Sequence, residues 1–281
     1  MFWIALPLTM VYLGLCGFMY VRQRELVYLP HQTRVEATQT NFALVNGDVT
    51  LRGWVVNPGR KRALVYFGGN SEAIQLNRSS FARWFPQHTV YLVAYRGFGA
   101  SEGQPDEAGL ASDALALFDH VRLQHPRIGV DVIGYSLGSG VAAHVAAQRP
   151  VRRLALITPY DTLADVGQAH YRWLPVRLLA RDRFDSVSNL SRRTGPTLVV
   201  RAGRDKVIPA ASTQRLIEAL PRRPRVLELP SAEHGNVAAA PGFSRTLKAF
   251  FATPAPRSGP SAINPVAIHV HRPLPGRRKS T

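Results

Sequence analysis

Three residues of the chain have side chains that could act together in nucleophilic catalysis: Ser136, Asp205 and His234. A serine hydroxyl attacks effectively only when a base takes its proton, and the usual base is a histidine that a carboxylate holds in one tautomer. Serine, then acid, then histidine is a known chain order for such a group. Taken singly, each residue has a plainer interpretation: a turn serine, a solvated loop aspartate and a surface histidine.

The serine is the centre of a Gly-x-Ser-x-Gly pentapeptide at residues 134–138. An apolar run at residues 128–133 predicts a buried strand before it, and residues 140–148 predict a helix after it. A tight strand-to-helix turn pushes the central side chain out of the sheet, and the glycines let the backbone make that turn. We therefore expect Ser136 to be the nucleophile.

The candidate acid and base each come directly after a predicted strand. Asp205 and His234 follow the last two predicted strands, at the sheet edge where ligands of parallel sheets bind. Two other acids compete for the same role. Glu233 adjoins the histidine, but neighbouring loop side chains usually diverge, and Asp161, which follows an earlier strand, is the reserve.

Acyl transfer also needs hydrogen-bond donors for the oxyanion that develops in the transition state. We expect one donor to be the backbone N–H of Leu137, directly after the nucleophile. The second should come from the loop at residues 67–71, where two glycines allow a close backbone approach. Asn70 is the expected donor there, with Ser71 in reserve.

The remaining expected substrate contacts are Gly69, Ser71 and Tyr135, which flank the nucleophile and the oxyanion loop. Cys16 is the only cysteine, so no disulfide can form within the chain and no cysteine-based metal site is possible. The nine histidines show no close metal-ligand spacing. We expect neither a metal ion nor an organic cofactor.

Short apolar strands alternate with helical patterns through the body of the chain, after an expected hairpin around Asn46-Gly47. This alternation predicts an α/β fold with a mostly parallel sheet covered by helices on both faces. The expected elements are strands at 63–67, 90–94, 128–133, 154–157, 197–201 and 226–229, and helices at 72–85, 107–124, 140–148, 211–220 and 243–251. Residues 159–195 interrupt the alternation and carry exposed-looking aromatic residues, which favours a small helical cap over a plain long connection.

Residues 2–21 contain no charged side chain. A helix of this length is long enough to cross a bilayer. We expect residues 1–25 to form an uncleaved transmembrane anchor. A buried core helix and a cleaved signal peptide are the alternatives, but the latter lacks a basic start and an A-x-A-like exit. Arg22 and Arg24 follow the run, which slightly favours a cytoplasmic position for the rest of the chain.

The chain is strongly basic, with 35 Lys and Arg against 18 Asp and Glu. The arginines are scattered, and no basic helix with interleaved aromatics stands out, so we expect no specific nucleic-acid partner. A membrane surface would attract the same charge. Residues 253–281 are rich in proline and basic residues, and we expect them to be a disordered tail.

Several stretches resemble the α/β-hydrolase superfamily, and in particular its N-terminally anchored, bud-emergence-like branch. They are residues 66–71 (YFGGNS), 95–103 (YRGFGASEG), 134–138 (GYSLG), 181–186 (RDRFDS), 203–209 (GRDKVIP) and 233–235 (EHG), within residues 26–252. Gly68 and Ala94 stand where the family usually has His and Asp, and the change at Gly68 predicts a less supported oxyanion loop. The resemblance implies serine hydrolase activity on esters, thioesters or amides.

These observations predict a membrane-anchored serine hydrolase that cleaves a small-molecule acyl ester or thioester, with lipids among the candidate substrates. A peptidase or amidase of the proline-aminopeptidase type is the enzymatic alternative. A non-catalytic membrane scaffold is the other alternative, although a scaffold has no need of three such residues in order.

Overall fold

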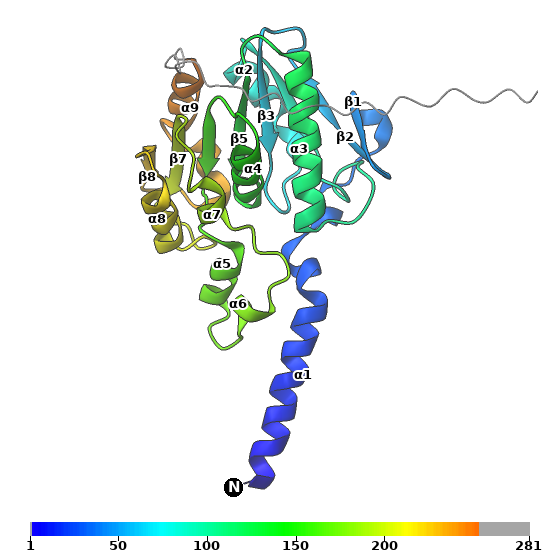
Figure 1. The fold of residues 1–281 in the computed structure, drawn as a ribbon, viewed down its shortest axis with the longest axis vertical. Coiled ribbons are helices and arrows are strands. Elements are labelled where there is room, and N and C mark those ends of the chain that lie inside the picture. The colour runs from blue at the N-terminus through cyan, green and yellow to red at the C-terminus, as the bar shows by residue number, and fades with distance from the viewer. Residues whose placement is uncertain (1, 253–281) are drawn as a thin grey trace, which may run out of the picture.

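The computed structural model describes residues 2–252, with the backbone alone for residues 2–5. Within this range eight strands form one sheet, in the order β1-β2-β4-β3-β5-β6-β7-β8 (Figure 1). Its strands are β1 (Phe42–Asn46), β2 (Val49–Val56), β3 (Arg62–Phe67), β4 (His88–Val93), β5 (Val130–Tyr135), β6 (Leu154–Ile157), β7 (Thr197–Ala202) and β8 (Arg225–Leu229). The tail predicted for residues 253–281 lies outside the described residues.

The sheet is mostly parallel, as predicted. The strands from β4 to β8 pair in parallel, whereas β2 pairs antiparallel with both β1 and β4. The predicted hairpin turns at Asn46-Gly47, where Gly47 has a positive φ of 62° that glycine adopts without strain. The carboxyl ends of the parallel strands therefore meet at one edge of the sheet.

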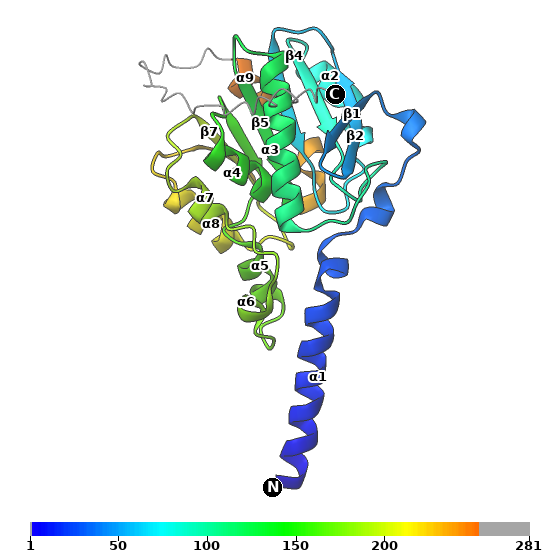
Figure 2. The same cartoon turned by 45° about the vertical axis from the view of Figure 1, so that its right-hand side comes forward.

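Helices cover both faces of the sheet (Figures 1 and 2). Helices α2 (Arg78–Trp84) and α9 (Phe243–Ala252) pack on one face, and α3 (Glu107–Gln124), α4 (Leu137–Gln148), α7 (Ser186–Leu190) and α8 (Ala210–Ala219) on the other. The central strands are apolar because both of their faces are covered: all but the first residue of β3 are buried, and every residue of β4.

Several predicted elements are shifted in the structure, two of them directly before residues of the site. The strand predicted at 128–133 runs over Val130–Tyr135, because Gly129 makes a left-handed turn with φ 83° directly before it. The helix predicted at 72–85 is shorter: a 3₁₀ turn over Ile74–Asn77 precedes α2. The side chain of Glu72, at the start of the predicted helix, instead accepts hydrogen bonds from the Gly69 N–H of the preceding loop and from the Asn77 side chain at the end of the 3₁₀ turn.

The interruption at residues 159–195 contains a small projection made of α5 (Leu163–His170) and α6 (Val176–Leu179) (Figure 2). We call these two helices the cap. Helix α7, which the prediction included in the cap, packs instead against α4 and α8 on the sheet. The cap is therefore smaller than the predicted insertion.

Helix α1 (Phe2–Val27) extends away from the sheet beside the cap (Figures 1 and 2). It continues two residues past the predicted anchor. Among the residues whose side chains are described, no helix is long and apolar enough to cross a membrane, so the predicted span is not confirmed.

A polar seam holds the end of α1 against the segment that follows the cap. Arg24 donates to both carboxylate oxygens of Asp182, at 3.1 and 3.2 Å, and the Tyr28 hydroxyl donates to the same carboxylate at 3.1 Å. Asp182 is nearly buried, and burial raises the pKa of Tyr28, which keeps its phenol protonated as a donor. Gln23 adds hydrogen bonds to the Leu179 carbonyl and from the Arg181 amide.

The central strands predict a large cost for truncating their side chains. Leu64 on β3 is fully buried between the helix layers, so Leu64→Ala should lower the free energy of unfolding by about 2–5 kcal/mol. The control Leu123→Ala removes a side chain that is 79% exposed and should change it by less than about 0.5 kcal/mol. Urea unfolding followed by circular dichroism measures both, and equal losses would contradict this assignment of the core.

Candidate active site

Ser136 sits on a strained turn between β5 and α4, with φ 51° and ψ −119°. Such a conformation costs a non-glycine residue about 1–3 kcal/mol and persists only where its surroundings enforce it. The Ser136 N–H donates to the Ile157 carbonyl at 2.9 Å, and Ser139 donates twice to the Ser136 carbonyl. Gly134 and Gly138 allow the crossing: a Cβ on Gly138 would collide with the Phe67 carbonyl.

The three candidate residues form a continuous hydrogen-bonded series. Ser136 Oγ lies 2.8 Å from His234 Nε2, and His234 Nδ1 lies 2.8 Å from Asp205 Oδ2. The other carboxylate oxygen of Asp205 accepts the N–H groups of Val207 and Ile208, both at 2.8 Å. The backbone therefore fixes the carboxylate through Oδ1, and Oδ2 is directed at the imidazole.

The competing acids are engaged elsewhere. Asp161 is buried, where Oδ1 accepts from Ser212 at 2.5 Å and Oδ2 from Arg215 at 2.6 Å. Glu233 caps the 3₁₀ helix that begins at His234 and runs to Ala239. The structure thus brings Asp205 to the imidazole and uses the other two carboxylates to hold other elements in place.

Glu72 is the residue that the sequence prediction missed at the oxyanion loop. Its carboxylate accepts from the Gly69 N–H at 2.8 Å, the Tyr66 hydroxyl at 2.7 and 2.8 Å, and Asn77 Nδ2 at 2.7 Å. A Cβ on Gly68 would come within 2.7 Å of this carboxylate. Ile74 and Glu72 occupy the space that a side chain at position 68 would need, and Glu72 holds the loop through the Gly69 N–H. That the loop is less supported than in the rest of the family stays a prediction.

Asn70 joins the oxyanion loop to the end of α1. Its side-chain amide donates to the Val27 carbonyl at 2.9 Å, and its carbonyl accepts the Leu29 N–H at 3.1 Å. Leu137, the other expected donor, is the first residue of α4, whose N–H has no acceptor within the helix. Both backbone positions flank Ser136 in the same pocket.

Tyr135 contacts the histidine as well as the pocket. Its hydroxyl donates to the His234 carbonyl at 2.9 Å, and the two rings lie 5.6 Å apart between centroids. Burial raises the pKa of Tyr135, and the nearby Glu72 and Asp205 carboxylates add to the effect. The phenol therefore stays protonated and holds the backbone of His234, a positioning contact that the sequence alone did not indicate.

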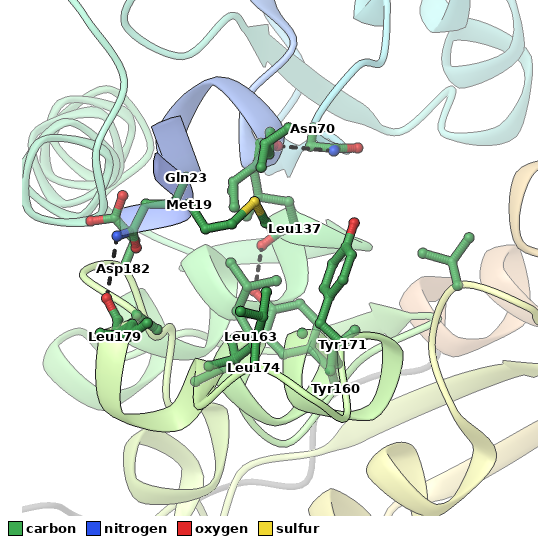
Figure 3. A pocket seen from close by; sticks show the side chains of 18 of the residues that line it. Met19, Gln23, Asn70, Leu137, Tyr160, Leu163, Tyr171, Leu174, Leu179 and Asp182 are labelled. Atoms are coloured by element: carbon green, nitrogen blue, oxygen red, sulfur yellow. Dashed lines mark hydrogen bonds between the residues drawn. The ribbon is translucent and has the colours of Figure 1, made fainter. Parts of the chain in front are cut away.

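Two cavities meet at Ser136 and Asn70. The first, of about 250 Å³, lies between α1, the cap and the nucleophile turn (Figure 3), and we call it the cap pocket. The second, of about 530 Å³, lies beside α2 and the 3₁₀ helix of His234, and we call it the α2 pocket. The expected substrate contacts Gly69, Ser71 and Tyr135 all line the α2 pocket.

Removing the charge of Glu72 should loosen the oxyanion loop. In Glu72→Gln an amide replaces the carboxylate that accepts three donors, so we expect kcat on a soluble ester to fall about tenfold with little change in KM. Stopped-assay kinetics measure both constants, and Glu218→Gln on the exposed side of α8 is the matched control. An unchanged kcat in Glu72→Gln would contradict the positioning role.

Known proteins resemble this chain in sequence and in fold. Residues 63–190 match the family described as alpha/beta hydrolase fold. An uncharacterized protein of Mycobacterium tuberculosis is 30% identical over 236 residues, covering 79% of this chain and 84% of that protein. Protein bem46 of Schizosaccharomyces pombe is 24% identical over 281 residues (88% and 91%), and lysophosphatidylserine lipase ABHD12 of Danio rerio is 31% identical over 147 residues (46% and 38%).

Among solved structures, an esterase of Pyrococcus furiosus superposes with a TM-score of 0.62 at 15% identity, covering 78% of this chain and 96% of that one. That likeness concerns the fold, whereas the sequence relatives carry the family assignment. The chain belongs to the α/β-hydrolase superfamily, in its bud-emergence-like branch.

Proposed function

We propose that the protein is a serine hydrolase that cleaves carboxylic esters or thioesters through an acyl-enzyme. The observation that carries the proposal is the unbroken series from Ser136 Oγ through His234 to Asp205, located where two pockets meet. Membership of a hydrolase superfamily agrees with it.

In the first half of the proposed reaction, Ser136 Oγ attacks the acyl carbonyl as its proton passes to His234 Nε2. Asp205 stabilises the imidazolium that results and keeps the ring oriented. The backbone N–H groups of Leu137 and Asn70 stabilise the negative charge that develops on the carbonyl oxygen by donating hydrogen bonds to it. His234 then gives its proton to the leaving oxygen or sulfur, which departs and leaves an ester on Ser136.

In the second half, a water molecule replaces the departed alcohol or thiol. His234 takes a proton from the water, the hydroxide attacks the acyl carbonyl, and the same two N–H groups hold the second oxyanion. Ser136 leaves with the proton that His234 held, and the carboxylic acid is released. His234 accepts or donates the proton in each transfer of this sequence of steps.

The lining of the cap pocket supports an acyl ester as the substrate rather than a peptide. It is formed mainly by aliphatic side chains, among them Met19, Leu26, Leu163, Val166, Leu174 and Val176. The Danio rerio relative is a lysophosphatidylserine lipase and the structural neighbour from Pyrococcus furiosus is an esterase, which agrees with this choice. We propose that esters and thioesters are cleaved faster than aminoacyl amides.

Covalent labelling tests the nucleophile. A fluorophosphonate probe should label the wild-type chain and fail to label Ser136→Ala, because only an activated serine attacks the phosphorus. Ser231→Ala changes an exposed serine close to His234 in sequence and should be labelled like the wild type. Equal labelling of Ser136→Ala would contradict the assignment, and faster cleavage of aminoacyl-nitroanilides than of nitrophenyl esters would contradict the ester preference.

We also propose that α1 attaches the protein to a membrane. Its exposed side chains are predominantly apolar along much of the helix: Leu6, Leu8, Met10, Val11, Leu13, Phe18 and Val21 are each more than half exposed. Exposed apolar area of this extent favours burial in lipid. Arg22 and Arg24, the charges that favoured a cytoplasmic position, pair with the carboxylates of Glu25 and Asp182. The side of the membrane on which the rest of the chain lies stays a prediction from sequence.

Two charges on α1 should abolish this attachment. We expect the full chain to float with phosphatidylcholine vesicles in a density gradient and Leu8→Lys/Val11→Lys to remain at the bottom, because each lysine opposes burial by about 2.5–3.5 kcal/mol near the bilayer centre. Leu76→Lys/Leu123→Lys makes the same change at equally exposed positions on the catalytic body and should still float. Flotation of the α1 variant would refute the attachment.

A further inference from the structure

The two pockets differ in their position relative to the imidazole. Ser136 and Asn70 line both of them, whereas His234 lines the α2 pocket and is absent from the lining of the cap pocket. Since His234 must protonate the leaving oxygen, that oxygen has to lie on the side of the imidazole. The acyl carbon stays bonded to Ser136, so the rest of the acyl group must extend the other way.

The side chains of the two pockets match this division. The cap pocket is walled mainly by aliphatic groups of α1 and the cap. The α2 pocket is mixed: the polar residues Ser71, Glu72, Asn77 and Ser80 line it together with the apolar side chains of Phe81, Trp84, Val237, Phe243 and Leu247. An apolar chain gains free energy in the first, and a polar alcohol finds hydrogen-bond partners in the second.

Helix α1 forms one wall of the cap pocket. Met19, Gln23 and Val27 line it from α1. Figure 3 shows Met19 and Gln23 across the cavity from Leu163 and Leu174. The seam from Arg24 and Tyr28 to Asp182 fixes this wall beside the cap. The match to the family covers residues 63–190, so this wall comes from a part of the chain that lies outside it.

Resting on the proposed hydrolase activity, we propose that the acyl chain of the substrate binds in the cap pocket against α1, and that the alcohol leaves through the α2 pocket. Helix α1 is then a specificity-determining part of the active site as well as an attachment. The Asn70 side chain donates to the carbonyl of Val27, the last residue of α1, and this contact joins the same helix to the oxyanion loop.

Steric blocks placed separately in the two pockets test the division. In the cap pocket, Met19→Trp and Val176→Phe add bulk on opposite walls, from α1 and from α6. Each buried methylene of an acyl chain contributes roughly fourfold to kcat/KM, so displacing two of them should lower the dodecanoate-to-butyrate ratio for nitrophenyl esters about tenfold or more.

The matched controls are neighbours that do not line the pocket. Phe18→Trp lies beside Met19 on α1, and Leu178→Phe lies in the same short helix as Val176, with side chains 59% and 80% exposed. Both should keep the wild-type dodecanoate-to-butyrate ratio. A fall in this ratio that is as large in the controls as in the pocket variants would overturn the proposal.

The reciprocal block is Ala238→Trp, at an exposed position that lines the α2 pocket. It should lower the rate for butyrates of bulky alcohols, such as methylumbelliferone, relative to nitrophenol, while the acyl-length ratio stays unchanged. Full-length protein in detergent micelles serves for every assay, and fluorophosphonate labelling of Ser136 reports that each variant retains a folded site.

The outcomes separate the two proposals. Selective loss of long acyl chains in the cap-pocket variants, with selective loss of bulky alcohols in Ala238→Trp, supports the division. Ester turnover with the reverse pattern, or with neither effect, overturns the division and leaves the hydrolase proposal standing. Absence of both ester turnover and probe labelling in the wild-type chain overturns both.

Discussion

The site depends on one strained turn. Ser136 holds a backbone conformation that an isolated chain would avoid, and the surrounding packing enforces it. The close approach of α4 to β5 and β3 is possible because Gly134 and Gly138 have no side chains, and the Ile157 carbonyl fixes the serine amide from the neighbouring strand. The direction of the hydroxyl toward His234 is therefore a property of the sheet, and the loop alone would not maintain it.

Carboxylates with distinct tasks surround this turn. Asp205 orients the imidazole, Glu72 holds the oxyanion loop, and Asp182 ties α1 beside the cap. Each has its lone pairs occupied by defined donors, which offsets the cost of taking a charged group out of water. Asp161, the reserve candidate for the acid, has the same character but is hydrogen-bonded to Ser212 and Arg215 of α8 instead of to His234.

Helix α1 links the attachment of the protein to its chemistry. Much of the helix extends away from the sheet with exposed apolar side chains, while its last turns line the cap pocket and contact Asn70. In the proposed function, a lipid acyl chain would reach Ser136 along the helix that holds the protein on the membrane. The small cap then has a clear role, because it supplies the opposite wall of a pocket that α1 closes.

The sequence by itself determined the order of the strands and helices, the position of Ser136 on a turn, and the choice of Asp205 and His234 as its partners. Those features follow from local patterns: apolar runs, glycine placement and residues directly after strands. Tertiary structure decided what depends on contacts between distant segments. The contacts of Tyr135 with His234 and of Asp182 with Arg24 and Tyr28 join segments far apart in the sequence, so no local pattern predicts them. The partners of Glu72 are near in sequence, but they meet in a turn where the sequence predicted the start of a helix. The two pockets and the wall that α1 forms likewise exist only once residues 19–27 lie against residues 163–182, an arrangement that no spacing along the chain encodes.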